Sequence, residues 1–178
     1  MKKHNGMRPQ DVAVLLKVIT LDEQVWQSKD LAASLRISAS EVSESLRRSA
    51  YAGLFQKHNK RVSRLALFDF LVYGLRYVFP QQPGALTQGI PTAHSASPLK
   101  AMMSDGGINY VWPMAKGPVR GQSIEPLYPG AAIAAQEDPK LYELLTLVDA
   151  LRVGRARERE LAQKEIKKRI LYAAEHQS

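Results

Sequence analysis

The 178-residue sequence predicts a mainly helical protein of the α+β class, with one small β-hairpin among its helices. Apolar residues recur at helical spacing near both ends of the chain, and a basic segment follows two short helical patterns joined by a tight turn. From Pro80 to about Asp138 the chain holds most of its prolines and glycines. We therefore expect a helical part with the hairpin at 1–79, an irregular packed segment at 80–137 and C-terminal helices at 138–178.

The first predicted helix covers residues 9–22. Its apolar face carries Val12, Leu15, Leu16 and Ile19. These positions are three or four residues apart, so they share one side of a helix. Pro9 suits the first turn, where a missing backbone N–H costs nothing. We expect this helix to support the two that follow.

Residues 28–54 predict a helix, a tight turn at 36–38 and a second helix over about residues 39–52. The apolar faces are Leu31, Ala32 and Leu35 in the first helix and Val42, Leu46 and Ala50 in the second. Ser38 can accept a hydrogen bond from a free backbone N–H of the second helix, and Glu41 completes the reciprocal capping box. The two helices can therefore pack crosswise on a shared core.

Basic residues dominate the segment that follows. The stretch 47–64 has no acidic residue and contains Arg47, Arg48, Lys57, His58, Lys60, Arg61 and Arg64. Residues 1–80 hold 13 basic and 7 acidic side chains, so they contribute +6 to the net charge of +8. This excess beside a helix–turn–helix pattern is typical of a polyanion binder. Residues 55–62 favour a β-hairpin that turns near His58–Asn59, with a loop as the alternative because the strands are short.

The pattern S-K-D-L-A-x-x-L-x-I-S-x-S-E-V-S-x-x-L, followed by A-G-L-F and the basic turn, resembles the winged helix-turn-helix domain of MarR-like bacterial regulators over roughly residues 9–64. The resemblance implies that the second helix enters the major groove of double-stranded DNA. The expected base-reading residues are Ser40, Ser43, Glu44 and Arg47. Arg47 is the preferred reader because arginine can pair bidentately with guanine. The expected DNA backbone-binding residues are Ser38, Arg48, Lys57, His58, Lys60, Arg61 and Arg64.

Three alternatives stay open for this part of the chain. The helix pair could be a buried structural hairpin, Glu44 could be a plain solvated residue, and the basic patch could coat nucleic acid without sequence preference. The main expectation is a sequence-specific transcriptional regulator, a repressor that acts as a homodimer, because dimers double the recognised site.

Residues 63–79 predict a helix that is apolar nearly all round and ends at Pro80. Such a helix is usually buried, here either beneath the N-terminal helices or against a second copy.

The proline- and glycine-rich segment predicts short extended pieces near residues 108–112 and 119–127, packed as irregular structure. Its aromatic and polar side chains could line a ligand pocket. They are His94, Tyr110, Trp112 and Tyr128. A role as the core that holds irregular backbone in place is favoured over the pocket.

Residues 138–178 predict two helices that meet near Gly154. An apolar stripe and the arginines beside it could dock on a second subunit or another protein. The expected contacts are Leu144, Val148, Leu151, Arg155 and Arg159. The alternative is that the stripe packs on its own domain and the arginines form same-helix ion pairs.

The phrases GIPTAHSA, YVWP and EPLYP are similar to parts of uncharacterised bacterial regulators, some of which are encoded beside nucleotidyltransferase-like toxins. This segment departs from the MarR pattern, whose second half is largely helical. The similarity implies an alternative function, in which the chain is an antitoxin that neutralises a neighbouring toxin through residues 138–178 and also represses its own operon.

Composition disfavours several other classes of protein. Without cysteine there is no disulfide framework and no thiolate zinc site, which suits a cytoplasmic protein. The N-terminus lacks a secretory signal, and no apolar run is long enough to span a membrane. The four histidines lack metal-ligand spacing, no phosphate-binding glycine loop or nucleophile elbow is present, and His94–Ser95 lacks a partner acid. We therefore expect no enzymatic activity, no cofactor and no metal.

Overall fold

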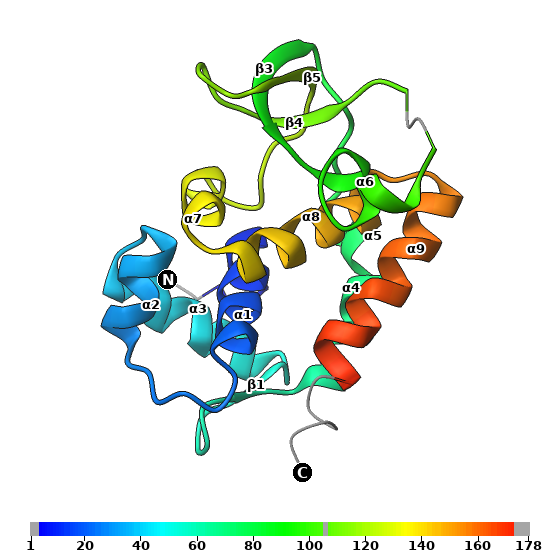
Figure 1. Ribbon diagram of the computed structural model, residues 1–178. Coiled ribbons are helices and arrows are strands. Elements are labelled where there is room, and N and C mark those ends of the chain that lie inside the picture. The colour runs from blue at the N-terminus through cyan, green and yellow to red at the C-terminus, as the bar shows by residue number, and fades with distance from the viewer. Residues whose placement is uncertain (1–3, 105–106, 173–178) are drawn as a thin grey trace.

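A computed structural model describes residues 4–104 and 107–172 as a mainly helical α+β structure (Figure 1). The α-helices are α1 (Pro9–Leu21), α2 (Ser28–Leu35), α3 (Ala39–Tyr51), α4 (Arg64–Tyr73), α5 (Leu75–Val78), α6 (Leu99–Met102), α7 (Ala131–Glu137), α8 (Pro139–Val153) and α9 (Ala156–Lys167). A 3₁₀ turn, η1 (Ala93–Ser95), and a π-helical turn, η2 (Lys168–Tyr172), complete the helical elements of these residues. The strands are β1 (Phe55–Gln56), β2 (Arg61–Val62), β3 (Leu86–Pro91), β4 (Tyr110–Pro113) and β5 (Val119–Ser123).

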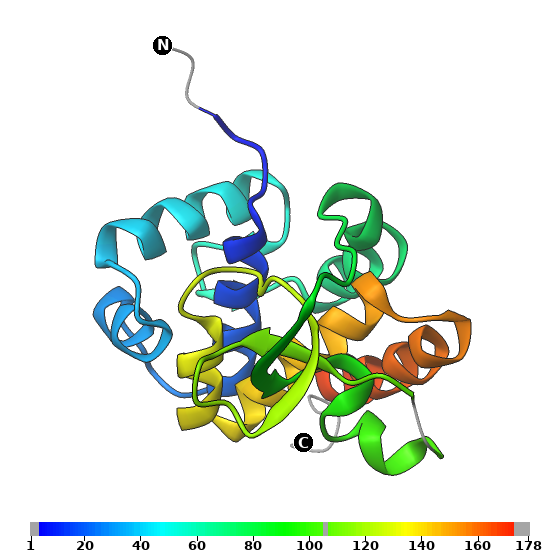
Figure 2. The same ribbon diagram turned by 90° about the horizontal axis from the view of Figure 1, so that it is seen from above.

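Helix α8 crosses the middle of the molecule and contacts α1, α4, α5, α7 and α9 (Figure 1). Seen from above, the strands β3–β5 lie over the helices, with α1–α3 on one side and α4, α5 and α9 on the other (Figure 2). The buried apolar side chains form one continuous cluster that runs from Val12 to Ile170. The central helix therefore joins the N-terminal helices to the C-terminal ones.

The local signals of the N-terminal sequence produce the expected elements. Helix α1 has Pro9 in its first turn and ends within one residue of the predicted boundary. The turn between α2 and α3 contains Arg36 in the left-handed region, with φ 57° and ψ 43°. The Ser38 Oγ accepts from the Glu41 backbone N–H at 3.1 Å, and the Glu41 carboxylate accepts from the Ser38 N–H at 2.9 Å. The predicted capping box is thus confirmed, and it fixes where α3 begins.

The predicted hairpin over residues 55–62 is also confirmed. Strands β1 and β2 pair antiparallel, with Phe55 opposite Val62 and Gln56 opposite Arg61. Phe55 and Val62 point into the core, while Gln56 and Arg61 are exposed. One apolar pair therefore anchors the hairpin, and its tip extends into solvent.

The structure of residues 63–79 differs from the predicted single helix in two ways. The observed segment is divided at Gly74 into α4 and α5, and only one side of it is buried. The buried side chains are Leu67, Phe68, Leu71 and Leu75. The exposed large side chains are Leu65, Tyr73, Tyr77 and Val78. Within one copy of the chain burial is therefore one-sided, and burial of the other side against a second copy stays a prediction.

The proline- and glycine-rich segment forms a small sheet in which each of three strands pairs with both others. Strand β3 is antiparallel to β4 and β5, which are parallel to each other. The extended pieces predicted near 108–112 and 119–127 overlap β4 and β5, whereas β3 was not predicted. The strands approach closely at Gly89, where a Cβ atom would collide with the carbonyl oxygen of Trp112. Only glycine fits that position without moving a strand.

Candidate nucleic-acid interface

The outer side of α3 presents a stripe of polar side chains. Ser40 and Ser43 are exposed, and Glu44 and Arg47 are half-buried. The spacing of three or four residues places all of them on one side of the helix. Tyr51, which is 73% exposed, continues the stripe four residues beyond Arg47. Sequence reasoning missed Tyr51, although its four-residue spacing from Arg47 was the available signal.

The guanidinium of Arg47 is held from two sides. Its Nε donates to the Glu44 Oε2 at 3.1 Å, while Nη1 donates to the Asn5 Oδ1 at 2.8 Å and Nη2 to the His4 carbonyl oxygen at 3.4 Å. The segment before α1 therefore lies against this face of α3. Arginine donates through a fixed set of N–H groups. Arg47 must therefore release Asn5 and His4 before these groups can donate to a base edge or a phosphate.

The hairpin places four predicted residues beside one another in solvent, namely Lys57, His58, Lys60 and Arg61. Lys60 Nζ lies 5.2 Å from the centre of the Trp26 ring, a cation–π distance that fixes the hairpin against the loop after α1. Arg61 pairs with Glu23 at 3.2 Å, and both side chains are largely exposed. Exposed pairs of this kind contribute about 0–1 kcal/mol. Arg61 can therefore exchange Glu23 for a phosphate at little cost.

Arg48 has a different role from the predicted one. It is buried, with its Nε 2.8 Å from Asp11 Oδ2 and its Nη2 2.7 Å from Asp11 Oδ1. The hydrogen bonds that Arg48 donates to the Asp11 carboxylate are the main cause of the raised pKa of Arg48. We therefore withdraw Arg48 as a DNA backbone contact: its guanidinium faces the core, and the bidentate pair joins α3 to α1.

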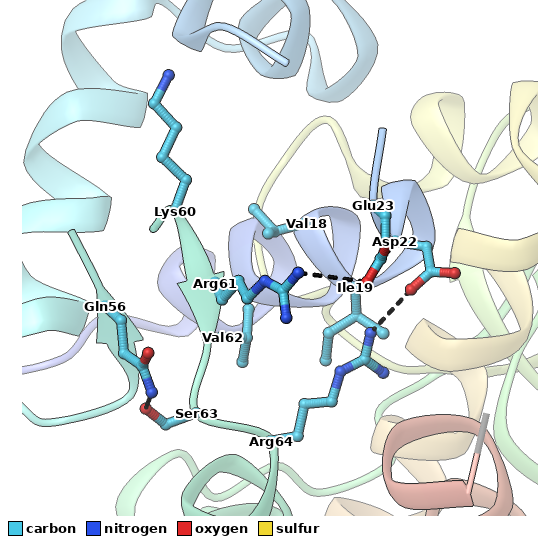
Figure 3. A pocket seen from close by; sticks show the side chains of 10 residues that line it. All are labelled: Val18, Ile19, Asp22, Glu23, Gln56, Lys60, Arg61, Val62, Ser63 and Arg64. Atoms are coloured by element: carbon cyan, nitrogen blue, oxygen red, sulfur yellow. Dashed lines mark hydrogen bonds and ion pairs between the residues drawn. The ribbon is translucent and has the colours of Figure 1, made fainter. Parts of the chain in front are cut away.

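Arg64 also faces inward, into a cleft of about 490 Å³ between the end of α1 and the hairpin (Figure 3). Its Nη1 donates to the Ile170 carbonyl oxygen at 3.0 Å, and its Nη2 lies 3.5 Å from Asp22. In Figure 3 the Arg61 and Arg64 side chains point toward Glu23 and Asp22. Arg64 therefore joins the start of α4 to the C-terminal turn and lies apart from the hairpin tip.

The aromatic residues of the proline- and glycine-rich segment support the core interpretation over the ligand pocket. Trp112 is buried and donates from Nε1 to the Asp149 carboxylate at 2.7 Å. The Tyr128 hydroxyl donates to the Leu35 carbonyl oxygen at 2.9 Å, and burial raises the pKa of Tyr128. His94 is buried against Tyr110, with ring centres 4.6 Å apart. These side chains hold the small sheet on the helices.

The predicted C-terminal contact residues divide into two groups. Leu144, Val148 and Leu151 lie inside the chain's own core, with at most 4% of each exposed, so they are withdrawn as partner contacts. Arg155 is exposed at the start of α9. Arg159 is half-buried and donates to the Gly154 carbonyl oxygen at 2.7 Å. The apolar stripe of α8 therefore packs on its own domain, as the alternative interpretation held.

Comparison with protein-family models, curated proteins and solved structures finds no match to this chain. In residues 4–104 and 107–172, no three histidine, aspartate or glutamate side chains gather as metal ligands. No helix in these ranges has the length and apolar character needed to cross a bilayer. A conclusion about function therefore rests on the residues and their arrangement.

Proposed function

We propose that the chain is a sequence-specific double-stranded DNA-binding transcriptional regulator whose N-terminal part is a winged helix-turn-helix. It acts as a repressor and as a homodimer. One observation supports the proposal most: the polar stripe of α3, exposed at Ser40 and Ser43, lies on a helix that contacts strand β1 of the hairpin. The exposed residues of that hairpin are Lys57, His58, Lys60 and Arg61. We assign repression because a protein bound at an operator blocks the access of RNA polymerase to the DNA.

The dimensions of α3 support a helix that reads DNA. Its 13 residues extend about 20 Å, and the major groove is wide enough to admit one helix. Helix α2 and the capped turn pack against α3, while the Asp11–Arg48 pair joins it to α1. With its backbone anchored in this way, α3 can present the stripe from Ser40 to Arg47 in one fixed orientation.

The hairpin cations support backbone contacts beside the reading helix. Among the described residues, Lys57 and His58 have no hydrogen bond or ion pair, and the pair that Arg61 makes is exposed. Cations that neutralise phosphates add affinity without sequence information and make binding salt-dependent. In this proposal α3 therefore provides sequence specificity, and the hairpin provides affinity.

Arg47→Ala is expected to remove discrimination, whereas Lys57→Ala removes affinity. Loss of the Arg47 guanidinium should cost about 1–3 kcal/mol of preference for the cognate duplex, since a bidentate arginine–base pair contributes that much. Lys57→Ala should weaken cognate and scrambled duplexes alike and reduce the salt slope by about 1. Lys57 is a cleaner choice than Lys60, which also contacts Trp26. Fluorescence anisotropy with both duplexes over a range of salt concentrations measures these effects.

The matched control is Arg120→Ala, which removes an exposed arginine from β5 in the small sheet. It should change neither preference nor salt slope. Unchanged specificity in Arg47→Ala would remove Arg47 from the reading role. Equal losses in Lys57→Ala and Arg120→Ala would show that binding depends on net charge alone, which is the general coating alternative.

A further inference from the structure

Helices α4 and α5 expose an apolar face that has no cover in the described residues. Leu65 is 63% exposed, Tyr73 68%, Tyr77 74% and Val78 55%. Leu65, Asp69 and Tyr73 are four residues apart and so share one side of α4. Large apolar side chains gathered in this way mark a surface that binds another protein. We call this surface, from Leu65 to Val78, the α4–α5 face.

A hollow of about 300 Å³ lies at one end of the α4–α5 face, between α5 and α9. Tyr73, Arg76 and Tyr77 line one side of it, and Arg159 and Glu160 line the other. The face thus combines protruding aromatic rings with a recess next to them. A partner that packs on it needs both a projection and a hollow of matching size.

The α4–α5 face also carries one charge of each sign. Asp69 is exposed and makes no hydrogen bond or ion pair with the described residues. Arg76 stacks on the Tyr77 ring, with its guanidinium carbon 5.4 Å from the ring centre, and has no carboxylate partner in residues 4–104 and 107–172. Arg76 lines the hollow together with Tyr73, and Tyr73 shares one side of α4 with Asp69. Both charges therefore lie beside Tyr73 on the α4–α5 face.

We infer that the α4–α5 face binds the same face of a second copy of this chain, in an antiparallel arrangement about a two-fold axis. Such an axis brings every residue i opposite a residue j and every j opposite i. Asp69 then meets Arg76 of the partner subunit, and the Tyr73 side chains of the two copies meet near the axis. Each of the two charges then has a partner of opposite sign, and the two ends of the face on one copy pack against the opposite ends on the other.

Charge complementarity selects a second copy over other occupants. A nucleic acid or anionic membrane would leave Asp69 next to like charge, which is unfavourable. A different protein would have to supply one charge of each sign at matching positions. A second copy supplies them by symmetry alone. This inference deepens the proposed function, which includes a homodimer, but it does not require DNA binding.

Sedimentation equilibrium of the full chain without DNA tests the inference. The wild-type protein should be a dimer at micromolar concentrations. Tyr73→Glu should raise the dimer dissociation constant at least about 30-fold, since an aromatic side chain at the centre of an interface commonly contributes that much. The matched control is Val25→Glu, which places the same charge at a 99% exposed apolar position outside the face and should leave the dimer intact.

A charge swap tests the orientation. Asp69→Arg and Arg76→Asp should each weaken the dimer, because each places like charges opposite each other, and the double variant should recover most of the loss. A monomeric wild-type chain, or a double variant no better than its worse single variant, would overturn the inference. A dimer that prefers no duplex would leave this interface standing and reject the proposed function. A monomer that binds DNA specifically would overturn this interface and the homodimer, and would leave sequence-specific DNA binding standing.

Discussion

Arg48→Ala should lower the free energy of unfolding by about 3–5 kcal/mol, which is the cost of leaving one member of a buried ion pair without its partner. The Asp11 side chain is fully buried, and its two oxygens accept from Arg48 at 2.7 and 2.8 Å. Removing the guanidinium leaves a buried carboxylate whose remaining hydrogen bond, among the described residues, comes from the Arg8 backbone N–H. Urea unfolding followed by far-ultraviolet circular dichroism measures the change, with the slope fixed between variants.

Two control variants test whether the loss of stability comes from the buried ion pair. Arg36→Ala breaks an exposed pair with Glu137 and should cost less than about 1 kcal/mol. The double variant Asp11→Leu/Arg48→Met should be more stable than Arg48→Ala, because it removes both charges and keeps volume in the core. A loss below about 0.5 kcal/mol in Arg48→Ala would mean that this pair does not hold α3 on α1.

Asp149→Ala should have an effect of similar size, about 3–5 kcal/mol, since it leaves several buried donors unsatisfied. The Asp149 carboxylate accepts from Thr92 Oγ1 at 2.7 Å, Trp112 Nε1 at 2.7 Å and Arg152 Nη2 at 3.2 Å. Burial raises the pKa of Asp149, while Arg152 and the hydrogen bonds act in the opposite direction. These contacts join α8 to β4 and to the residue after β3, so we expect the small sheet to loosen from the helices.

Tryptophan fluorescence in a Trp26→Phe background reports on this region through Trp112 alone, because the chain has two tryptophans. In that background Asp149→Ala should shift the unfolding midpoint detected at Trp112 to lower urea. Glu160→Ala, which breaks an exposed pair with Lys164, should stay within about 0.5 kcal/mol of its parent. An unchanged Trp112 transition in Asp149→Ala would show that the small sheet does not depend on this carboxylate.

Local signals made the N-terminal fold predictable. Pro9 in a first turn and the Ser38–Glu41 capping box act within one turn of helix, so the sequence alone contains them. Of the two helix breaks at glycine residues, near Gly74 and Gly154, such local signals predicted only one. Gly154 was expected to divide two helices and does, whereas Gly74 lay inside a pattern so apolar that it predicted one continuous helix.

Distant contacts account for what could not be predicted. Strand β3 reads LTQGIP, with a glycine and a proline that disfavour a strand, and it forms because β4 and β5 pair with both of its edges. Arg48 lies in a run of basic residues and looked like its neighbours, but its partner Asp11 is 37 positions away. Only the fold distinguishes a cation that faces solvent from one that faces the core.

Binding of the wild-type protein to a duplex from upstream of its own gene and to a scrambled duplex tests sequence-specific DNA recognition most simply. Fluorescence anisotropy from about 50 to 200 mM salt measures both affinities. A sequence-specific regulator should prefer the upstream duplex by about 10³-fold or more at physiological salt, as specific DNA-binding proteins do. Equal binding to both duplexes that disappears as salt rises would contradict sequence-specific recognition and leave the hairpin with an electrostatic role only.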